Sequence, residues 1–279
     1  IPHLDDPLEP SMLAPLGFGS RLEALRALHV PQTAEDAQRG RDRLAFDELM
    51  RLQLAIGVIR ESQRRAGGIA HPVDHRLVDQ WISGLPYPLT GAQARAISDV
   101  AGDLADPTPM NRLLQGDVGA GKTVVLTAAA LLVIGGGRQA AIVAPSEILA
   151  RQHYEEMREA LEPLGVQVDL LVSRHLPRPR KQVLADLADG TCRLAVGTHS
   201  LLMDTVTYRN LGVVIIDEQH RFGVDQRSAL SGRGDGGLMP DMLQATATPI
   251  PRTSAITEFG DMSVSVLDEK PPGRSPIVT

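Results

Sequence analysis

The sequence predicts a three-layer α/β protein, in which a parallel sheet lies between two layers of helices. Two observations predict this class. Over most of residues 85–279, short unbroken apolar segments alternate with longer segments of helical spacing, and one apolar segment runs directly into a Gly-rich loop and a helix. Strands buried on both faces appear as continuous apolar runs, and crossover helices join parallel strands. Because ligands bind at the carboxyl ends of such strands, we expect the functional residues in the loops that follow them.

The boundaries of the predicted elements follow from these runs and from the Gly and Pro residues that separate them. Helices are predicted at residues 71–81, 93–104, 124–134, 147–161, 180–188 and 250–259. Strands are predicted at residues 113–116, 139–144, 166–172, 193–196, 211–216, 242–246 and 263–267. One edge of the sheet should therefore collect the loops that follow Gln115, Ala144, Val196, Ile216 and Ala245.

The strongest motif is a phosphate-loop pattern between a predicted strand and a predicted helix. Glycines let the backbone wrap around an anion, and N–H groups at the helix start donate to phosphate oxygens. We expect Lys122 to contact the β- and γ-phosphates of ATP and the Thr123 hydroxyl to ligate Mg²⁺. The alternative is an ordinary Gly-rich turn, which the Lys-Thr pair and both flanking elements disfavour. The candidate nucleotide-binding residues of this loop are Gly116, Asp117, Val118, Gly119, Ala120, Gly121, Lys122 and Thr123.

A second acidic motif follows the most hydrophobic predicted strand, which ends at Ile216. Asp217 is expected to ligate Mg²⁺, directly or through water, because Mg²⁺ prefers few protein carboxylates and retains waters. Glu218 is then placed to orient and deprotonate the attacking water. The alternative is a solvated acidic turn, which is common at strand ends. Spacing alone gives Gln219 and His220 no role in hydrolysis.

Hydroxyl-bearing residues follow three further strands. Thr246 and Thr248 are expected to hydrogen-bond the acidic cluster and respond to the γ-phosphate, or only to cap the next helix. Two other helix starts face the same edge, where backbone N–H groups are suited to nucleic-acid phosphates. The candidate residues at these two helix starts are Pro145, Ser146, Glu147, Thr198 and His199.

Gln93 is a candidate for contact with adenine. Thr90 caps the helix in which Gln93 occupies the first turn, and a Gln amide there presents one donor and one acceptor, which match the N6 and N7 atoms of adenine. The alternative is a surface Gln in a helix. The position of Gln93 just ahead of the phosphate loop favours the adenine contact.

Capping patterns predict helices in the N-terminal part of the chain. Ser20 and Glu23 form a capping-box pattern, and Thr33 with Asp36 starts a second helix that continues without Pro to about Ala66. Its predicted apolar face contains Ala45, Leu49, Leu52, Ile56 and Ile59. Its other face contains Arg39, Arg41, Arg43, Arg60, Arg64 and Arg65. This basic face indicates either a strut near DNA or a solvated face, and the intervening acids favour the solvated face.

Composition limits the classes of protein that fit. The net charge is −6 and aromatic residues make up only 3%, which argues against a base-stacking platform and against purely electrostatic binding of nucleic acid. The single cysteine, Cys192, excludes an internal disulfide and a multi-cysteine zinc site, and we expect it buried on a strand. No basic-then-apolar signal occurs, and the longest apolar run is too short to span a bilayer. We expect a cytoplasmic monomer without membrane contact.

Taken together, the motifs resemble the first motor lobe of superfamily 2 helicases, and within that superfamily the RecG family of ATP-dependent DNA helicases. The sequences GDVGAGKT, DEQHRFGV and TATPIPRT and the ending Pro271–Arg274 carry the resemblance to that family, and the long Arg-rich helix is similar to its connector. The segments that carry the superfamily resemblance are Leu89–Gln93, Gly116–Thr123, Ala144–Glu147, Gly197–His199, Asp217–Val224 with Gln226 and Arg227, and Thr246–Pro249.

The resemblance implies a RecA-like P-loop NTPase lobe and ATP-driven movement on branched duplex DNA, including Holliday junctions and stalled forks. It assigns catalysis to Lys122, Asp217, Glu218 and His220, and the coupling of hydrolysis to DNA to His220 with Thr246 and Thr248; Gln219 belongs to the same candidate DNA-coupling set. Ala120 stands where the family usually has Ser, a change of little consequence because the loop uses backbone N–H groups there. Three alternatives stay open: a transcription-repair coupling factor, an RNA helicase and a nucleotide-binding module that is not a motor.

The resemblance also predicts three regions. Residues 1–19 are expected to be the tail of an upstream wedge domain, residues 20–84 an α-helical connector, and residues 85–279 the first ATP-binding lobe, with no second lobe after Thr279. The arginine finger expected from a second lobe contributes about 10³- to 10⁵-fold in rate in related enzymes. We therefore expect this polypeptide to hydrolyse ATP barely, if at all, and not to unwind DNA. An ATPase assay that finds strong DNA-stimulated turnover would contradict this expectation.

Overall fold

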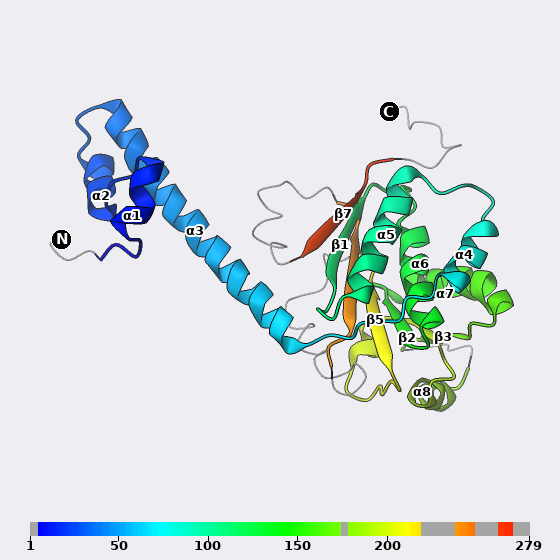
Figure 1. Cartoon of the computed structure of the whole chain (residues 1–279). Coiled ribbons are helices and arrows are strands. Elements are labelled where there is room, and N and C mark those ends of the chain that lie inside the picture. Colours follow the sequence, from blue (N-terminus) through cyan, green and yellow to red (C-terminus); the bar gives the residue numbers. More distant parts are fainter. Residues whose placement is uncertain (1–4, 174–177, 219–237, 249–261, 270–279) are drawn as a thin grey trace. The chain divides into compact units, whose positions relative to one another are not determined.

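The computed structural model describes residues 5–173, 178–218, 238–248 and 262–269 (Figure 1). Contacts divide the chain into two compact units, residues 1–60 and residues 61–279, with the boundary inside the long helix α3 (Ala34–Ala66). This division does not test the predicted functional boundaries at residues 19 and 84, which stay a prediction. Among the helices that the structure describes, none combines the length and the apolar character that a membrane span requires.

The first unit is helical, as predicted. The predicted capping box is confirmed, because Ser20 Oγ accepts a hydrogen bond from the Glu23 N–H and the Glu23 carboxylate accepts one from the Ser20 N–H. Thr33 and Asp36 make the same reciprocal bonds at the start of α3. These bonds satisfy N–H groups that have no partner within the helix. The elements of the unit are α1 (Pro10–Leu13), the 3₁₀ turn η1 (Ala14–Leu16), α2 (Arg21–His29) and the first part of α3.

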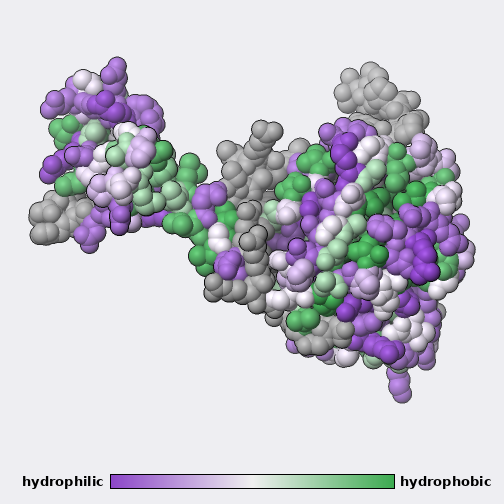
Figure 2. All heavy atoms as spheres, in the orientation of Figure 1, coloured by the Kyte–Doolittle hydropathy of each residue, from purple (hydrophilic) through white to green (hydrophobic). Residues whose placement is uncertain are grey.

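Helix α3 buries a charged pair, whereas most of its predicted apolar face is exposed. Arg43 and Asp47 are 1% and 4% exposed, while Leu49 and Ile59 are 58% and 47% exposed. Within the predicted apolar set only Ile56 is buried. Figure 2 shows hydrophobic surface along this helix. The period of the apolar residues therefore predicted the helix correctly but not the face that packs within the first unit.

The prediction that Arg43 lies on a solvated face is wrong, because the N-terminal segment supplies its partners. The guanidinium donates to both carboxylate oxygens of Asp6, at 2.9 and 3.1 Å, and to the carbonyl oxygen of Gly19 at 3.1 Å. It also pairs with Asp47 one turn along the helix. A buried charge is tolerated when it is paired and hydrogen-bonded in this way.

The second unit confirms the predicted alternation of strands and helices. For most elements, the observed boundaries differ from the predicted ones by a few residues. The predicted helix at 250–259 lies outside the described residues. The helices are α4 (His75–Ser83), α5 (Gly91–Ala105), α6 (Lys122–Gly135), α7 (Glu147–Leu161), η2 (Glu162–Leu164), α8 (Arg180–Asp189) and η3 (His199–Leu202). The strands are β1 (Asn111–Gly116), β2 (Gln139–Val143), β3 (Val168–Leu171), β4 (Leu194–Gly197), β5 (Leu211–Ile216), β6 (Asp241–Thr246) and β7 (Ser263–Leu267).

The described strands form one parallel sheet in the order β3-β4-β2-β5-β6-β1-β7. Successive residues of a strand face opposite sides, so the sheet has two cores. Ile215 belongs to the core cluster that includes residues of α5, α6 and α7, whereas Ile216 belongs to the cluster that includes residues of α8 and η3. Helices therefore cover both faces (Figure 1), which confirms the predicted three-layer class.

The segment before α4 is not helical, so the predicted helix start at His71 is wrong. The backbone N–H of His71 donates to the carbonyl oxygen of Leu104 at 2.8 Å, and its ring Nε2 lies 2.6 Å from a carboxylate oxygen of Asp241. The helix begins only at His75, after Asp74, whose carboxylate accepts from the Arg76 N–H. An Asp at this position caps a helix start.

Cys192 is buried, as predicted, but lies in the turn before β4 and not on a strand. Its thiol donates to the carbonyl oxygen of Leu194 at 3.4 Å. Burial raises the pKa of the thiol well above its ordinary value, so this sulfur is an inert small hydrophobic group.

The buried Asp241 carboxylate yields a pH-dependent prediction. Burial raises the pKa of Asp241 above its ordinary value of 3.8, although the bonds from His71 and from the Met110 N–H act in the opposite direction. The contribution of the Asp241 carboxyl group to stability is therefore fully present below its ordinary pKa and is lost as pH rises through the raised value. We expect the free energy of unfolding of the parent, relative to that of Asp241→Asn, to fall as the pH rises above the ordinary value of 3.8.

Urea unfolding followed by the fluorescence of Trp81, the only tryptophan, measures this difference. Asp79→Asn, at an exposed position of α4, is the control and should show no such trend. A difference that grows with rising pH would contradict the prediction.

Candidate functional site

The candidate site lies at the carboxyl edge of the sheet, where β5, β6 and β1 are neighbours. Gln115 of β1 pairs with Thr246 of β6, and Ile216 of β5 pairs with Gln244. The phosphate loop after β1 and the acidic pair after β5 therefore leave the same edge, with only the end of β6 between them. This brings together segments more than ninety residues apart in the sequence, as the parallel topology predicts.

The loop between β1 and α6 needs glycine at two positions. Gly119 and Gly121 have φ angles of 82° and 81°, in the left-handed region that side chains disfavour. At Gly116 a side chain is excluded for a different reason, because a Cβ there would lie 2.9 Å from the Leu267 side chain on β7. Val118, at the loop tip, is 82% exposed. The loop thus carries an open backbone turn directly onto the N-terminus of α6, where an anion is favoured.

Lys122 lies over the loop that it follows. Its Nζ donates to the carbonyl oxygens of Gly116 at 2.8 Å and Asp117 at 3.2 Å. The ammonium group is therefore held inside the curve of the loop by weak neutral acceptors. Phosphate oxygens, which carry charge, are stronger acceptors for the same donors.

Gln93 connects α5 to the phosphate loop. Its amide oxygen accepts from the Thr90 N–H at 2.9 Å, and its amide nitrogen donates to the carbonyl oxygens of Ala120 at 3.2 Å and Gly121 at 3.4 Å. The residue is fully buried, and Thr90 caps α5 as predicted. Both polar ends of the amide thus have protein partners, which gives Gln93 a role in holding the loop. Its contact with adenine stays a prediction.

Asp217 faces the layer that contains α6 and α7. Because Ile216 faces the opposite layer, strand alternation turns the Asp217 side chain toward these helices. Its backbone N–H donates to the carbonyl oxygen of Val143 at 3.0 Å, and its carboxylate lies 2.8 Å from Nε2 of His153 on α7. The sequence reasoning missed His153. Helical spacing could have identified it, because His153 precedes the apolar Met157 by four residues and therefore lies on the same inward face of α7.

Glu218 has an unusual backbone conformation, with a φ angle of 55°. A non-glycine residue in the left-handed region costs about 1 to 3 kcal/mol, and such residues concentrate at functional sites. The strand thus turns sharply between Asp217 and Glu218. The predicted residues Gln219 and His220 lie outside the described residues.

Thr246 and Thr248, at the end of β6, hydrogen-bond to each other. Thr246 Oγ1 lies 2.9 Å from Thr248 Oγ1 and accepts from the Thr248 N–H at 3.2 Å. Thr246 is buried and Thr248 is exposed. The pair stands at the end of β6, between the phosphate loop and the acidic pair.

The other predicted candidates follow β2 and β4, on the far side of β5 from the phosphate loop. Ser146 Oγ accepts from the Leu149 N–H and caps α7 as predicted, next to the half-buried Pro145. Glu147 accepts from the Ser173 N–H at 3.2 Å. These residues form a second group along the edge of the sheet, beyond β5.

The turn after β4 differs from the expected capped helix. Thr198 is buried and its hydroxyl lies 3.3 Å from that of Ser200, so it makes no side-chain cap. The helix that follows is the short 3₁₀ turn η3, on which His199 is exposed. Of this pair, His199 is the one that solvent reaches.

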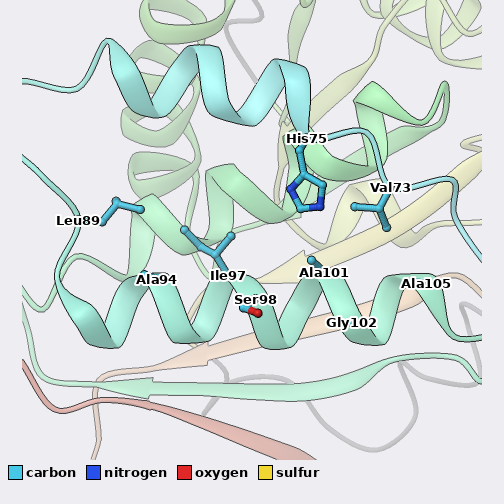
Figure 3. Close-up of a pocket in the computed structure, with 9 residues that line it drawn as sticks. All are labelled: Val73, His75, Leu89, Ala94, Ile97, Ser98, Ala101, Gly102 and Ala105. Atoms are coloured by element: carbon cyan, nitrogen blue, oxygen red, sulfur yellow. The ribbon is translucent and has the colours of Figure 1, made fainter.

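The second unit contains one cavity beside the phosphate loop and another beside helix α5. One, of about 240 Å³, is lined by the phosphate loop and by the ends of β1 and β7, including Gly116, Asp117 and Glu269. The other, of about 550 Å³, lies against α5, between Ile97 and His75 (Figure 3). Its lining includes no residue of the phosphate loop, so the smaller cavity is the one beside the candidate site.

Comparisons with known proteins agree with this geometry. A family model described as DEAD/DEAH box helicase matches residues 90–256. The ATP-dependent DNA helicase RecG of Thermotoga maritima is 43% identical over 92% of this chain and 33% of its own length, and that of Bacillus subtilis is 43% identical over 99% and 40%. A solved structure of RecG bound to a three-way DNA junction superposes with a TM-score of 0.86 and 38% identity, over 98% of this chain and 36% of that chain. The chain thus spans 33% to 40% of the length of these relatives.

Gln93 yields a prediction about the loop. Gln93→Ala removes both bonds to the loop carbonyls, so we expect a fluorescent ADP analogue to bind about 5- to 10-fold more weakly, by direct titration. If the Gln93 amide only holds the loop, the affinity of the variant for an analogue with guanine in place of adenine should fall by the same factor. If the amide only contacts adenine, the affinity for the guanine analogue should not change. Ser98→Ala, at an exposed position of α5, is the control. Unchanged affinity for both analogues would contradict a role in the site.

Proposed function

The chain belongs to the DEAD/DEAH box helicase family, and from this membership we propose that it is the ATP-binding motor lobe of an ATP-dependent DNA helicase that acts on branched duplex DNA. One observation carries the proposal: the Lys122 loop and the Asp217–Glu218 pair leave one edge of the sheet on either side of β6. ATP hydrolysis needs a phosphate-binding loop and a carboxylate for the metal side by side.

Lys122 and the loop 116–123 bind the phosphates of ATP in this proposal. The ammonium exchanges the Gly116 and Asp117 carbonyls for β- and γ-phosphate oxygens, and the N–H groups at the start of α6 donate to the same phosphates. Gln93 keeps the loop in place from α5 and contacts the base.

The donors at the site fit Mg²⁺. A carboxylate on Asp217 and a hydroxyl on Thr123 are hard oxygen ligands, and Mg²⁺ prefers few such protein ligands together with phosphate oxygens and water. When bound there, Mg²⁺ neutralises charge that develops on the transferred phosphoryl group. Glu218, next to Asp217 at the sharp turn after β5, orients the attacking water and accepts its proton.

We assign the binding of DNA to the second group along the same edge. At the start of α7, the backbone N–H groups of Ser146 and Glu147, directly after Pro145, are offered to DNA phosphates. In the turn after β4, the exposed His199, next to the buried Thr198, has the same proposed role. Coupling between the two groups falls to Thr246 and Thr248 at the end of β6, with Gln219 and His220 after the acidic pair. The position of Thr246 between the loop and the acids supports this assignment.

Branched DNA is the proposed substrate because the solved relative was captured on a three-way DNA junction. We keep the predicted division into an upstream tail at 1–19, a connector at 20–84 and the lobe at 85–279; the match of the helicase model to residues 90–256 supports the last boundary. A cytoplasmic location and a monomeric state complete the proposal.

Glu218→Gln in the full-length protein tests the proposed chemistry. The amide cannot accept the proton of the attacking water, so we expect ATP turnover to fall about 10²- to 10⁴-fold, with nucleotide binding retained. Unwinding of a synthetic Holliday junction should be lost with it. Turnover, nucleotide affinity and unwinding are measured on the same preparation, with Glu156→Gln, at an exposed position on α7, as the control.

Unwinding that survives the loss of hydrolysis would contradict a motor and indicate a nucleotide-binding module. Stimulation of turnover by RNA but not by branched DNA would contradict the proposed substrate.

A further inference from the structure

His153 is a buried polar residue that the proposed chemistry leaves without a task. It lies on α7 among the core residues Ala150, Tyr154 and Met157, and it is 7% exposed. Its Nε2 lies 2.8 Å from Oδ2 of Asp217, whose side chain is 14% exposed. A polar ring is buried among apolar neighbours only at a cost unless it is hydrogen-bonded.

The contact with Asp217 is the ring's one hydrogen bond within the part of the chain that the structure describes. The other ring nitrogen, Nδ1, is buried and has no hydrogen-bond partner there. If packing alone explained the residue, an apolar side chain would fill the same space without leaving a nitrogen unsatisfied. The bond to Asp217 therefore accounts for a histidine at this position.

This bond also limits how the carboxylate can turn. The backbone N–H of Asp217 is fixed to Val143 of β2, and Oδ2 is held by His153 from α7. With the backbone and one oxygen fixed, the second oxygen has a set direction at the edge of the sheet. Hydrogen bonds to metal-ligating carboxylates orient them in this way, and loss of such a bond typically costs 10- to 100-fold in metal affinity or activity, as an order of magnitude.

We infer that His153 is a positioning residue, which holds the Asp217 carboxylate in the orientation that binds the Mg²⁺ of the Mg²⁺–nucleotide complex. This inference rests on the proposed function, since it requires Asp217 to serve the metal. It also gives α7 a double role. The same helix carries Ser146 and Glu147 at its start, where DNA phosphates are proposed to bind, and the partner of the metal carboxylate two turns later.

Nucleotide binding by the full chain tests the inference without reference to turnover. A fluorescent ADP analogue is titrated in EDTA and then at rising Mg²⁺ concentrations. We expect His153→Ala to leave the affinity in EDTA unchanged, because Lys122 and the loop are intact. The Mg²⁺ concentration that gives half of the gain in affinity should rise about 10-fold or more. His153→Gln, whose amide can still donate to Oδ2, should restore most of the Mg²⁺ dependence.

Met157→Ala is the matched control for damage to the core. Met157 lies on the same face of α7 one turn later, is 2% exposed, and makes no hydrogen bond to Asp217. Its loss should lower the melting temperature and leave the Mg²⁺ dependence as in the parent. In the full-length protein, excess Mg²⁺ should restore the ATP turnover of His153→Ala, which a misfolded site would not allow.

The outcomes separate this inference from the proposed function. If His153→Ala has the same Mg²⁺ dependence as the parent, or if Met157→Ala shifts the Mg²⁺ dependence as much as His153→Ala does, the role of His153 is overturned and the proposed function is not. If the parent chain shows no Mg²⁺-dependent binding, or if Asp217→Asn keeps it in full, the proposed function fails and this inference fails with it.

Discussion

The parallel pairing of β5, β6 and β1 is the constraint on which the site depends. Two loops far apart in the sequence reach one edge because all three strands run in the same direction, and the register places the end of β6 between them. Strand alternation then turns Asp217 toward α6 and α7, and α6 is the helix that follows the loop 116–123. Reversal of β1 would send Lys122 to the opposite edge, and reversal of β5 would send Asp217 there; either change would separate the two halves of the site.

Two histidine–carboxylate contacts lie at opposite edges of the same sheet. At the carboxyl edge, His153 holds Asp217; at the opposite edge, His71 holds Asp241 at the start of β6 and ties the segment before α4 to the sheet. Each pair joins a helix or its preceding segment to a strand end through side chains. The His153–Asp217 pair concerns the candidate site, to which its carboxylate belongs. The His71–Asp241 pair concerns the stability of the fold.

Features with a local cause could be predicted from the sequence, and features with a distant cause could not. The loop at 116–123, the cap at Thr90 and the apolar strand ending at Ile216 each depend on neighbouring residues, and the structure has them. Arg43 is buried because of Asp6, 37 residues away, and His153 and His71 have partners 64 and 170 residues away. Periodicity also predicted the helix α3 but not its packed face, because that face is set by charge pairing with the N-terminal segment.

The proposed ATP site requires a single metal–nucleotide complex that joins the Lys122 loop to Asp217. This can be examined in a crystal structure of the chain with a non-hydrolysable ATP analogue and Mn²⁺, in which anomalous scattering locates the metal. We expect one metal peak beside the nucleotide phosphates and the Thr123 hydroxyl, with the Asp217 carboxylate bound to it directly or through water. A nucleotide bound elsewhere, or a metal without contact to Asp217, would show that the two motifs do not form one ATP site.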